Sequence, residues 1–331
     1  MSAGTPGETS MERFRWGILG TGGIANKFAA GLADAKGAQL VAIGSRTGES
    51  AERFGAKWNV PHRHASYAAL AEDPEVDAIY VSTPHTLHRE NTLLCLRAGK
   101  AVLCEKPFAM NAREAQEMIH CARAERRFLM EGMWTRWNPV TLRVRELLRE
   151  GAIGEPRMFT CDLGFRADFD PSSRLFDPSL GGGALLDVGV YCVSYAHMVF
   201  GAPPREIAGL ADRGTTGVDE QSACVLRYEN GALALLSCAV RTDTPIEATI
   251  AGTRGWIRVP NFYDPDHYLL NGETVRVERV GNGFNHEAEE VHRAVRAGAL
   301  ESEGLPLDES LDILRTLDRI RAQWGLRYPA D

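Results

Sequence analysis

A short apolar strand that breaks into a glycine-rich turn and continues as a helix constrains this chain more than any other feature. The run is Arg15-Trp16-Gly17-Ile18-Leu19-Gly20-Thr21-Gly22-Gly23-Ile24-Ala25. In its Gly-x-Gly-x-x-Ala pattern the first glycine makes the turn, the second lets backbone N–H groups approach a pyrophosphate, and the small third residue lets helix and strand pack closely. Ordinary turns also collect glycine, but here the glycines stand between a strand and a helix whose N-terminus faces the phosphates. The residues expected to bind the cofactor in this turn are Gly20, Thr21, Gly22, Gly23 and Ile24.

Length and charge narrow the class of protein. A chain of 331 residues exceeds the usual size of one core, so we expect two domains. The net charge of -7 argues against a nucleic-acid partner, which needs clustered positive charge. Chemistry on a small molecule is therefore favoured.

The cysteines and the N-terminal residues argue against disulfide-rich, metal-binding and secreted proteins. The seven cysteines are an odd number, with no Cys-x-x-Cys pair and no clustered histidines, so we expect buried thiols and neither a disulfide framework nor a metal site. Residues 1–12 are small and polar, which predicts a disordered leader instead of a signal peptide. No window approaches a membrane span, so we expect a cytoplasmic protein.

Strands and helices alternate over residues 13–133, as in a doubly wound parallel sheet of the Rossmann type. The expected strands after the glycine turn are 39–45, 76–82, 101–104 and 128–130. A helix is predicted from the N-cap Asn111, with Glu114 three residues on, to about Glu125. This part is expected to be the dinucleotide-binding domain.

Longer alternating strands and hairpin signals fill residues 134–331. We expect a helix from Asn138-Pro139 to Gly151, and an α+β domain with an open, predominantly antiparallel sheet that serves substrate binding and oligomerisation. Its strands are predicted at 155–164, 206–212, 222–228, 232–241, 247–252 and 256–259, with a hairpin turn at Glu229-Asn230-Gly231. Helices are predicted at 183–200, 286–296 and 309–324.

The end of the second strand indicates which dinucleotide is bound. NAD-binding folds place Asp or Glu about twenty residues past the glycines, on the ribose 2′-hydroxyl, whereas an arginine suits a 2′-phosphate. Here the sequence reads Gly44-Ser45-Arg46-Thr47, with no acid before Glu49. Ser45 and Arg46 therefore predict NADP as the cofactor, against the alternative of a solvated loop arginine.

Two further strand ends place polar side chains at the same edge of the sheet. One strand ends in Thr83-Pro84-His85, with His88 one turn on, and the next ends in Glu105-Lys106-Pro107. Loops at the carboxyl ends of parallel strands line the ligand crevice, so these residues are expected to contact the cofactor. On its own, Lys106 could equally be a solvated loop tip.

A glycine-rich helix start in the second part carries a second set of polar residues. The run is Leu180-Gly181-Gly182-Gly183-Ala184-Leu185-Leu186-Asp187-Val188-Gly189-Val190-Tyr191. Asp187 and Tyr191 are four apart, on one helical face. A tyrosine near a lysine can be the general acid of a carbonyl reduction, because the cation favours the phenolate and lowers the tyrosine pKa. The alternative is a tyrosine that only packs in the core.

In this order and spacing, the motifs resemble the glucose-fructose oxidoreductase and inositol dehydrogenase (Gfo/Idh/MocA) family. The motifs are Gly-x-Gly-x-x-Ala, Thr-Pro with His88, Glu105-Lys106-Pro107 and Gly-Gly-Gly-x-Leu-x-Asp-x-Gly-x-Tyr. The runs Phe128-Leu129-Met130-Glu131-Gly132-Met133-Trp134-Thr135-Arg136 and Arg174-Leu175-Phe176-Asp177-Pro178 are most similar to the branch of dimeric dihydrodiol dehydrogenase and NADP-dependent D-xylose dehydrogenase. Several relatives have histidine where this chain has Tyr191, which favours this branch over inositol-type enzymes.

The resemblance implies hydride transfer between NADP and a CH–OH or C=O carbon of a sugar or cyclic diol. It implies Lys106 and Tyr191 as the catalytic pair and Asp187 as a group that orients substrate or tyrosine. Trp134 and Phe165 would form walls of the substrate pocket, and His88 would lie beside the nicotinamide. Two other functions stay open: a catalytically idle NADP-binding sensor, and a nonredox family member, such as a glycosidase, that uses NAD internally.

Strand patterning also predicts an oligomer. The run Ala232-Leu233-Ala234-Leu235-Leu236-Ser237-Cys238-Ala239-Val240 is apolar on both faces, unlike a strand with one solvated face. The helices of the second domain can cover only one face of its sheet. We therefore expect a homodimer in which the two open faces pack on each other.

Overall fold

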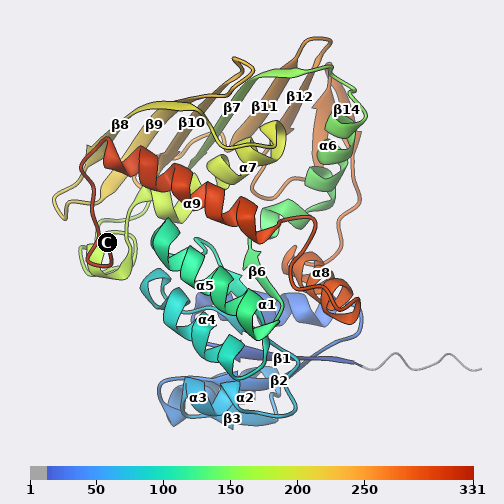
Figure 1. Ribbon diagram of the computed structural model, residues 1–331, viewed down its shortest axis with the longest axis vertical. Helices are drawn as coiled ribbons and strands as arrows, with labels where there is room; N and C mark the ends of the chain where they lie inside the picture. The colour runs from blue at the N-terminus through green and yellow to red at the C-terminus, as the bar shows by residue number, and fades with distance from the viewer. Residues whose placement is uncertain (1–12) are drawn as a thin grey trace, which may run out of the picture.

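The computed structural model describes residues 13–331, and the leader expected at residues 1–12 lies outside the described residues. Two sheets dominate the structure (Figure 1). The first is parallel with helices around it and the second is mostly antiparallel, so the α/β fold class predicted from the sequence is confirmed. The division into 13–133 and 134–331 stays a prediction.

The first sheet has six parallel strands in the order β3-β2-β1-β4-β5-β6. Chain order reverses between β1 and β4, and ligands of such sheets bind at the carboxyl ends of the strands beside this reversal. The strands are β1 (Phe14–Leu19), β2 (Ala38–Gly44), β3 (His62–His64), β4 (Ala78–Val81), β5 (Ala101–Glu105) and β6 (Leu129–Gly132).

Helices connect these strands and bury apolar faces on the sheet. Their caps follow the sequence: Asn111 accepts a hydrogen bond from the Glu114 N–H at 2.9 Å and begins the helix that was predicted there. The helices are α1 (Gly23–Asp34), α2 (Gly48–Trp58), α3 (Tyr67–Ala71), the short η1 (His85–Leu87), α4 (His88–Arg97) and α5 (Ala112–Glu125).

The second sheet has eight strands in the order β14-β13-β12-β11-β7-β10-β9-β8. Every neighbouring pair is antiparallel except β7 and β10, which are parallel. The strands are β7 (Pro156–Gly164), β8 (Glu206–Arg213), β9 (Asp219–Arg227), β10 (Leu233–Ala239), β11 (Glu247–Gly252), β12 (Trp256–Pro260), β13 (His267–Leu270) and β14 (Glu273–Arg276). Strands β3, β13 and β14 were not predicted. Strand β3 is only three residues long, and β14 is exposed at all four residues, so neither shows an alternating pattern.

The remaining helices cover one face of the second sheet or return to the first. They are η2 (Trp134–Trp137), α6 (Pro139–Arg149), η3 (Pro178–Leu180), the π-helical turn η4 (Leu185–Gly189), α7 (Val190–Phe200), α8 (Phe284–Arg296) and α9 (Leu307–Ala322). The helix predicted over 183–200 is thus a π-helical turn followed by an α-helix. Figure 1 shows α9 running between the second sheet and α5.

Helix α8 packs the C-terminal part of the chain against the first sheet. The Trp16 Nε1–H of β1 donates to His292 Nε2 of α8 at 2.7 Å, and Phe28 of α1 meets Phe284 edge to face. On the other side, the Ala112 N–H at the start of α5 donates to Asp318 of α9 at 2.9 Å. These contacts fix the two sheets relative to each other, so groups from both parts can meet in one site.

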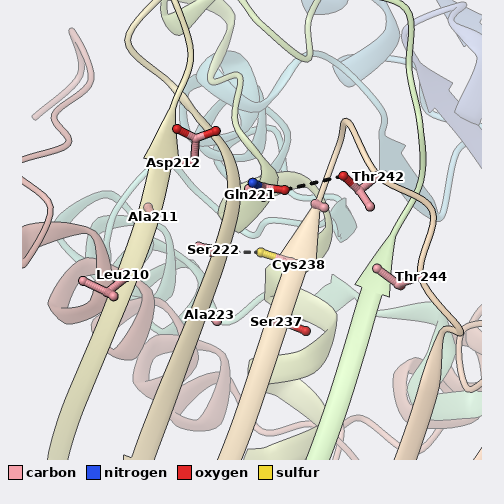
Figure 2. A pocket seen from close by; sticks show the side chains of 11 residues that line it. Leu210, Ala211, Asp212, Gln221, Ser222, Ala223, Ser237, Cys238, Thr242 and Thr244 are labelled. Atoms are coloured by element: carbon pink, nitrogen blue, oxygen red, sulfur yellow. Dashed lines mark hydrogen bonds between the residues drawn. The ribbon is translucent and has the colours of Figure 1, made fainter.

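The face of the second sheet that lies opposite α7 and α9 has no helix over it in the described part of the chain. Two adjoining hollows, of about 360 and 620 Å³, lie on β7 to β10 of this face. Figure 2 shows Leu210, Ala223 and Ser237 along the first of them, on β8, β9 and β10. Leu210 is 83% exposed, and contiguous exposed apolar side chains on a soluble protein mark an interaction surface.

Buried residues also include the seven cysteines, all free thiols, as expected. Contrary to the expectation that no window approaches a membrane span, one stretch among the described residues, Pro178–Phe200, is long and apolar enough to cross a membrane, and 89% of its most apolar window is buried inside the fold. A core helix passes that test equally well, and α7 is the core helix under the second sheet.

Candidate active site

The glycine turn between β1 and α1 has the shape that a bound pyrophosphate requires. Gly20 has φ +108°, and a Cβ there would lie 3.0 Å from Ser82 Oγ and 3.2 Å from the Ser82 carbonyl oxygen. A Cβ at Gly22 or Gly23 would meet no atom within 4 Å. Helix α1 has no side-chain cap and no acid in its first turn, so its amide groups remain available to an anion. The turn therefore fits the phosphates of a dinucleotide.

The end of β2 presents one buried and one exposed polar residue. Ser45 is buried, and its N–H donates to the His64 carbonyl oxygen at 3.1 Å. Arg46 is exposed and takes part in no hydrogen bond or ion pair within residues 13–331. Its charge lies close enough to Tyr67 to oppose the rise in the pKa of that phenol that burial causes. An unpaired guanidinium beside an aromatic ring suits an adenosine 2′-phosphate.

The buried His88 ring holds the turn after β4 by hydrogen bonds. The ring of His88 is fully buried, with Nδ1 2.8 Å from the Pro107 carbonyl oxygen and Nε2 2.9 Å from the Thr83 carbonyl oxygen. Burial lowers the pKa of His88 to about 4, although both carbonyls oppose this shift. The ring thus joins the loops after β4 and β5. The expected contact of His88 with the nicotinamide stays a prediction, and this geometry favours a positioning role.

The charges of Lys106, Asp187 and Arg174 act on the His85 ring. Its Nδ1 is buried without a hydrogen-bond partner among the described residues. Burial, with His88 and Lys106 nearby, lowers the pKa of His85 to about 3, so the ring is neutral at pH 7. Thr83 is buried and Pro84 is exposed beside it.

Glu105 and Lys106 point in different directions from the end of β5. Glu105 is buried, accepts the Tyr80 hydroxyl and accepts the Lys106 N–H at 3.1 Å. Burial raises the pKa of Glu105, with Lys106 opposing the shift. Because its carboxyl is turned into the core, the cofactor contact expected of Glu105 stays a prediction without support from this geometry. The Lys106–Pro107 peptide is cis.

Asp187 comes from the π-helical turn η4, whose start depends on a glycine. Gly183 has φ +122°, and a Cβ there would lie 2.3 Å from Asp219 Oδ1. Only glycine therefore lets the turn begin against β9. π-helical turns are rare and frequent at functional sites. Here the turn presents Asp187 to Lys106.

Two cations from two other segments meet Asp187. Lys106 Nζ is 2.7 Å from the Asp187 carbonyl oxygen and 3.3 Å from Oδ1, and Arg174 Nη1 is 2.8 Å from Oδ1. Burial alone raises the pKa of Asp187, but Lys106 and Arg174 hold it well below the usual range. No residue within 13–331 donates a hydrogen bond to Oδ2. Asp187 is therefore an anion with one oxygen available to a ligand.

Tyr191 is enclosed by aromatic rings and by Lys106. Lys106 Nζ lies 4.9 Å from the centroid of the Tyr191 ring, and Trp134 Nε1–H donates to the Tyr191 hydroxyl at 3.3 Å. Tyr263 meets Tyr191 edge to face at 5.1 Å between centroids and meets Trp134 in the same way at 4.9 Å. Trp134 is in turn stacked on Phe284 of α8. The structure thus brings together Lys106, Asp187, Tyr191 and Trp134.

The pKa of Tyr191 differs from the expectation. Burial, Tyr263 and Glu105 raise the pKa of Tyr191 well above its usual value. The Lys106 ammonium does not reverse this, because it lies over the ring and forms its hydrogen bond with Asp187. We expected the lysine to lower the tyrosine pKa; the protein as described instead keeps Tyr191 protonated at neutral pH.

Two residues of this group, Arg174 and Tyr263, were not predicted as site residues from the sequence, and the role predicted for Phe165 is not tested. Arg174 belongs to a motif that carried the family resemblance, and that motif was the only signal for it. Tyr263 follows β12 in a segment without periodic pattern, so nothing in the sequence pointed to it. Phe165 follows β7 and is half-buried, with its N–H bonded to the Ala239 carbonyl oxygen at 3.1 Å. Its role as a pocket wall stays a prediction.

Family models match two consecutive parts of this chain. An oxidoreductase family with an NAD-binding Rossmann fold, GFO_IDH_MocA, matches residues 14–133. The GFO/IDH/MocA C-terminal domain matches residues 141–258. Together these matches cover most of the residues that form the two sheets.

Curated relatives and solved structures match nearly the whole chain. It is 37% identical to trans-1,2-dihydrobenzene-1,2-diol dehydrogenase of Mus musculus, over 96% of this chain and 98% of the relative. The enzyme of the same name from Danio rerio is 38% identical over the same shares. Aldose-aldose oxidoreductase from Caulobacter crescentus, complexed with glycerol, superposes with a TM-score of 0.86 at 26% identity, over 95% of this chain and 99% of that one. The 3-ketoreductase KijD10 from Actinomadura kijaniata, in complex with NADP and TDP-benzene, gives 0.83 at 26%, over 94% and 98%.

Proposed function

The chain belongs to the Gfo/Idh/MocA oxidoreductase family and is an oxidoreductase acting on CH–OH donors; from that premise we propose an NADP-dependent dehydrogenase of cyclic diols or sugars. Tyr191 is its general acid and base, and Lys106 and Asp187 complete the site. The observation that carries the proposal is the meeting of Lys106, Asp187 and Tyr191 at the carboxyl end of β5.

The bound nicotinamide supplies or accepts the hydride. In the reducing direction the Tyr191 hydroxyl gives its proton to the substrate oxygen as a C–H bond forms at the carbonyl carbon. In the oxidising direction the Tyr191 phenolate takes the hydroxyl proton. The raised pKa of Tyr191 favours the protonated donor at neutral pH.

Asp187 can bind a second hydroxyl of a substrate that has two neighbouring hydroxyls. Its Oδ1 faces Lys106 and Arg174, and its Oδ2 is available to accept a hydrogen bond. A diol can therefore place one hydroxyl on Tyr191 and the next on Asp187. Trp134 and Tyr263 provide an apolar wall for the ring that carries these hydroxyls. Relatives named for a dihydrodiol and for aldoses support this class of substrate.

The NADP preference rests on the end of β2. Arg46 is exposed and unpaired in the described chain, and the acid that would bind a 2′-hydroxyl is missing before Glu49. Solved structures of a neighbour contain NADP, which supports the same choice. The groups that would hold the cofactor are the α1 amides, Ser45 and Arg46.

A panel of substrates tests the proposal directly. We expect NADPH formation with trans-cyclic diols or aldopentoses, faster than with inositols, and slower with NAD in place of NADP. Asp187→Asn should raise KM for diols more than for a simple cyclic alcohol, because it weakens the second hydroxyl contact. A panel of diols, pentoses, hexoses and inositols with no turnover on either cofactor would refute the proposal.

We also propose a homodimer that packs through the open face of the second sheet, and a cytoplasmic location. The exposed apolar side chains on that face, Leu210 among them, support the dimer. Seven thiols without a disulfide fit a reducing compartment.

A further inference from the structure

Two histidines and an aspartate meet at β3, the edge strand farthest from β6 in the first sheet. His62 and His64 are two apart on β3, so their side chains leave the same face of the strand. His62 Nδ1 is 2.7 Å and His64 Nε2 is 2.9 Å from the same atom, Asp73 Oδ2. We expected no clustered histidines from the sequence, and the structure differs: His62 and His64 lie beside Asp73, which follows α3.

Asp73 is fixed before any ligand arrives. Its Oδ1 accepts the Glu75 N–H at 2.9 Å, and its carbonyl oxygen accepts Lys100 Nζ at 2.5 Å. The carboxyl is buried, with 3% of its side chain exposed, whereas His62 and His64 are 34% and 24% exposed. An anionic oxygen therefore faces two imidazole nitrogens at a site open to solvent.

We propose that His62, His64 and Asp73 bind a divalent transition-metal ion, with zinc as the best match. The three ligand atoms lie within 4.8 Å of one another. Two imidazoles and one carboxylate are the ligand types that zinc, nickel, copper and cobalt prefer, whereas magnesium and calcium prefer oxygen alone. Water takes the fourth position of a tetrahedral ion.

Only small movements are needed for the ion to enter. Zinc binds nitrogen and oxygen at about 2.0–2.2 Å, which places tetrahedral ligand atoms about 3.3 Å apart. The two imidazoles therefore need to move away from Asp73 Oδ2 by roughly half an ångström and to bring Nδ1 and Nε2, which lie within 4.8 Å of each other, to the same spacing. Both rings are partly exposed and able to turn. The hydrogen bonds of Asp73 Oδ1 and of its carbonyl oxygen act as the outer shell that orients a metal ligand.

The ion would join the loop after α3 to the edge of the sheet. Strand β3 is only three residues long and pairs with β2 alone. A metal bridge to Asp73 adds a second attachment, and it stabilises the folded chain because the unfolded chain does not hold the three ligands together. Metal binding should therefore raise the melting temperature.

The alternative is a hydrogen-bonded triad in which both rings donate to Asp73 and no metal binds. A double variant separates the two, because His62→Asn and His64→Gln place amide nitrogens where Nδ1 and Nε2 stood. These amides still donate to the carboxylate but are poor metal ligands. Asp73→Asn is a second variant that removes the anionic ligand. His120→Ala, at an exposed histidine of α5, is the matched control.

The experiment is a titration of the metal-stripped full-length protein with cobalt, followed by displacement with zinc. We expect one cobalt per chain with the visible spectrum of a tetrahedral ion, zinc displacing it, and no competition from magnesium. The double variant and Asp73→Asn should bind zinc at least about a hundredfold more weakly, and His120→Ala should bind normally.

Thermal melts complete the test. Zinc should raise the melting temperature of the wild-type protein and of His120→Ala but not of the double variant. Should the double variant fail to fold, the same comparison is made with Asp73→Asn. Absence of cobalt binding in the wild-type protein, or equal zinc affinity in wild type and a folded ligand variant, would overturn the proposal.

Discussion

Asp187 is the residue on which the charges of the site depend. Lys106 and Arg174 both contact Oδ1, and together they keep the carboxyl ionised inside a buried site. An anion paired in this way is worth little for stability but fixes the positions of its partners. Lys106 is thereby held over the face of Tyr191, where its charge faces the ring on which a phenolate would form.

Tyr191→Phe keeps the ring against Trp134 and Tyr263 but removes the proton donor. We expect kcat to fall by about 10² to 10⁴, with the dissociation constant of NADPH nearly unchanged. Steady-state kinetics and cofactor fluorescence titration on the same preparation measure both. Lys106→Met should cost a similar factor, and the double variant far less than the product of the two, since the residues act as one unit.

The pH profile adds a check on the same tyrosine. Oxidation needs the phenolate, and because the pKa of Tyr191 is raised, the phenolate fraction should keep increasing with pH past pH 9. Reduction should lose no rate to tyrosine ionisation between pH 6 and 9. Retained turnover of Tyr191→Phe together with a lowered melting temperature would instead assign the tyrosine to the core alone.

Arg46→Ala tests the other end of the cofactor. A charge-assisted hydrogen bond contributes about 1.5 to 3 kcal/mol, so the NADP dissociation constant should rise roughly ten- to a hundredfold. The NAD dissociation constant should change little, because NAD lacks the 2′-phosphate. Isothermal titration with both cofactors measures the two constants, and equal losses would show that Arg46 does not contact the phosphate.

At the scale of elements, η2 is the segment that places Trp134 against Tyr191. Arg136 of this segment is buried, donates to the Ser194 carbonyl oxygen of α7 at 2.7 Å and pairs with Glu309 of α9. Although burial opposes it, His197 and Arg136 lower the pKa of Glu309 to about 2, so the pair stays charged at neutral pH. Two helices of the second part thus hold the loop that follows β6.

Local patterns predicted most elements but not the contacts between them. Strand β11 runs over Glu247–Gly252, as the alternation predicted, and α5 begins after Asn111 because that cap is encoded within four residues. The approach of Arg174 and Tyr263 to the site depends on loops of irregular pattern and on how α8 packs on α1. The His62, His64 and Asp73 group likewise depends on the turn of α3. Such pairings between distant segments carry no local signal in one sequence.

The buried carboxyl of Glu287, on α8, predicts how the stability of the fold changes with pH. It is fully buried, neither carboxyl oxygen has a hydrogen-bond partner among the described residues, and burial and Glu105 raise its pKa well above 4.5. The folded chain therefore keeps a proton that the unfolded chain releases, so this residue lowers stability as pH rises above about 4.5. Glu287→Gln cannot ionise and should escape that loss.

Melting temperatures of wild type and Glu287→Gln should diverge with pH. We expect near equality at pH 5 and a gap of about a few degrees in favour of the variant at pH 8. The control Glu303→Gln, at an exposed position, should follow the wild type throughout. Parallel curves for Glu287→Gln would show that the carboxyl ionises in the folded protein with a normal pKa.

At the scale of the whole molecule, the uncovered face of the second sheet exposes a group of large apolar side chains. Leu210, Val225, Leu235 and Met158 are 83, 40, 42 and 40% exposed, on the adjacent strands β8, β9, β10 and β7. Leu235 and Val225 are directly opposite each other in the ladder. Side chains of this kind on a flat sheet favour a partner with the same shape, and a second copy of the chain provides one.

We therefore expect the wild-type protein to have twice the 36.3 kDa chain mass at micromolar concentration. Leu210→Arg combined with Leu235→Arg places two charges in the proposed interface, where each buried, unpaired charge costs about 3 to 5 kcal/mol. The dimer dissociation constant should rise at least about a hundredfold, and the monomer should stay folded because both positions are solvent-exposed without a partner. Val280→Arg, 55% exposed and outside this face, is the control and should remain dimeric. Light scattering over a dilution series measures all three proteins. A wild-type monomer, or a double variant that keeps the wild-type mass at every concentration, would remove the sheet face from the assembly.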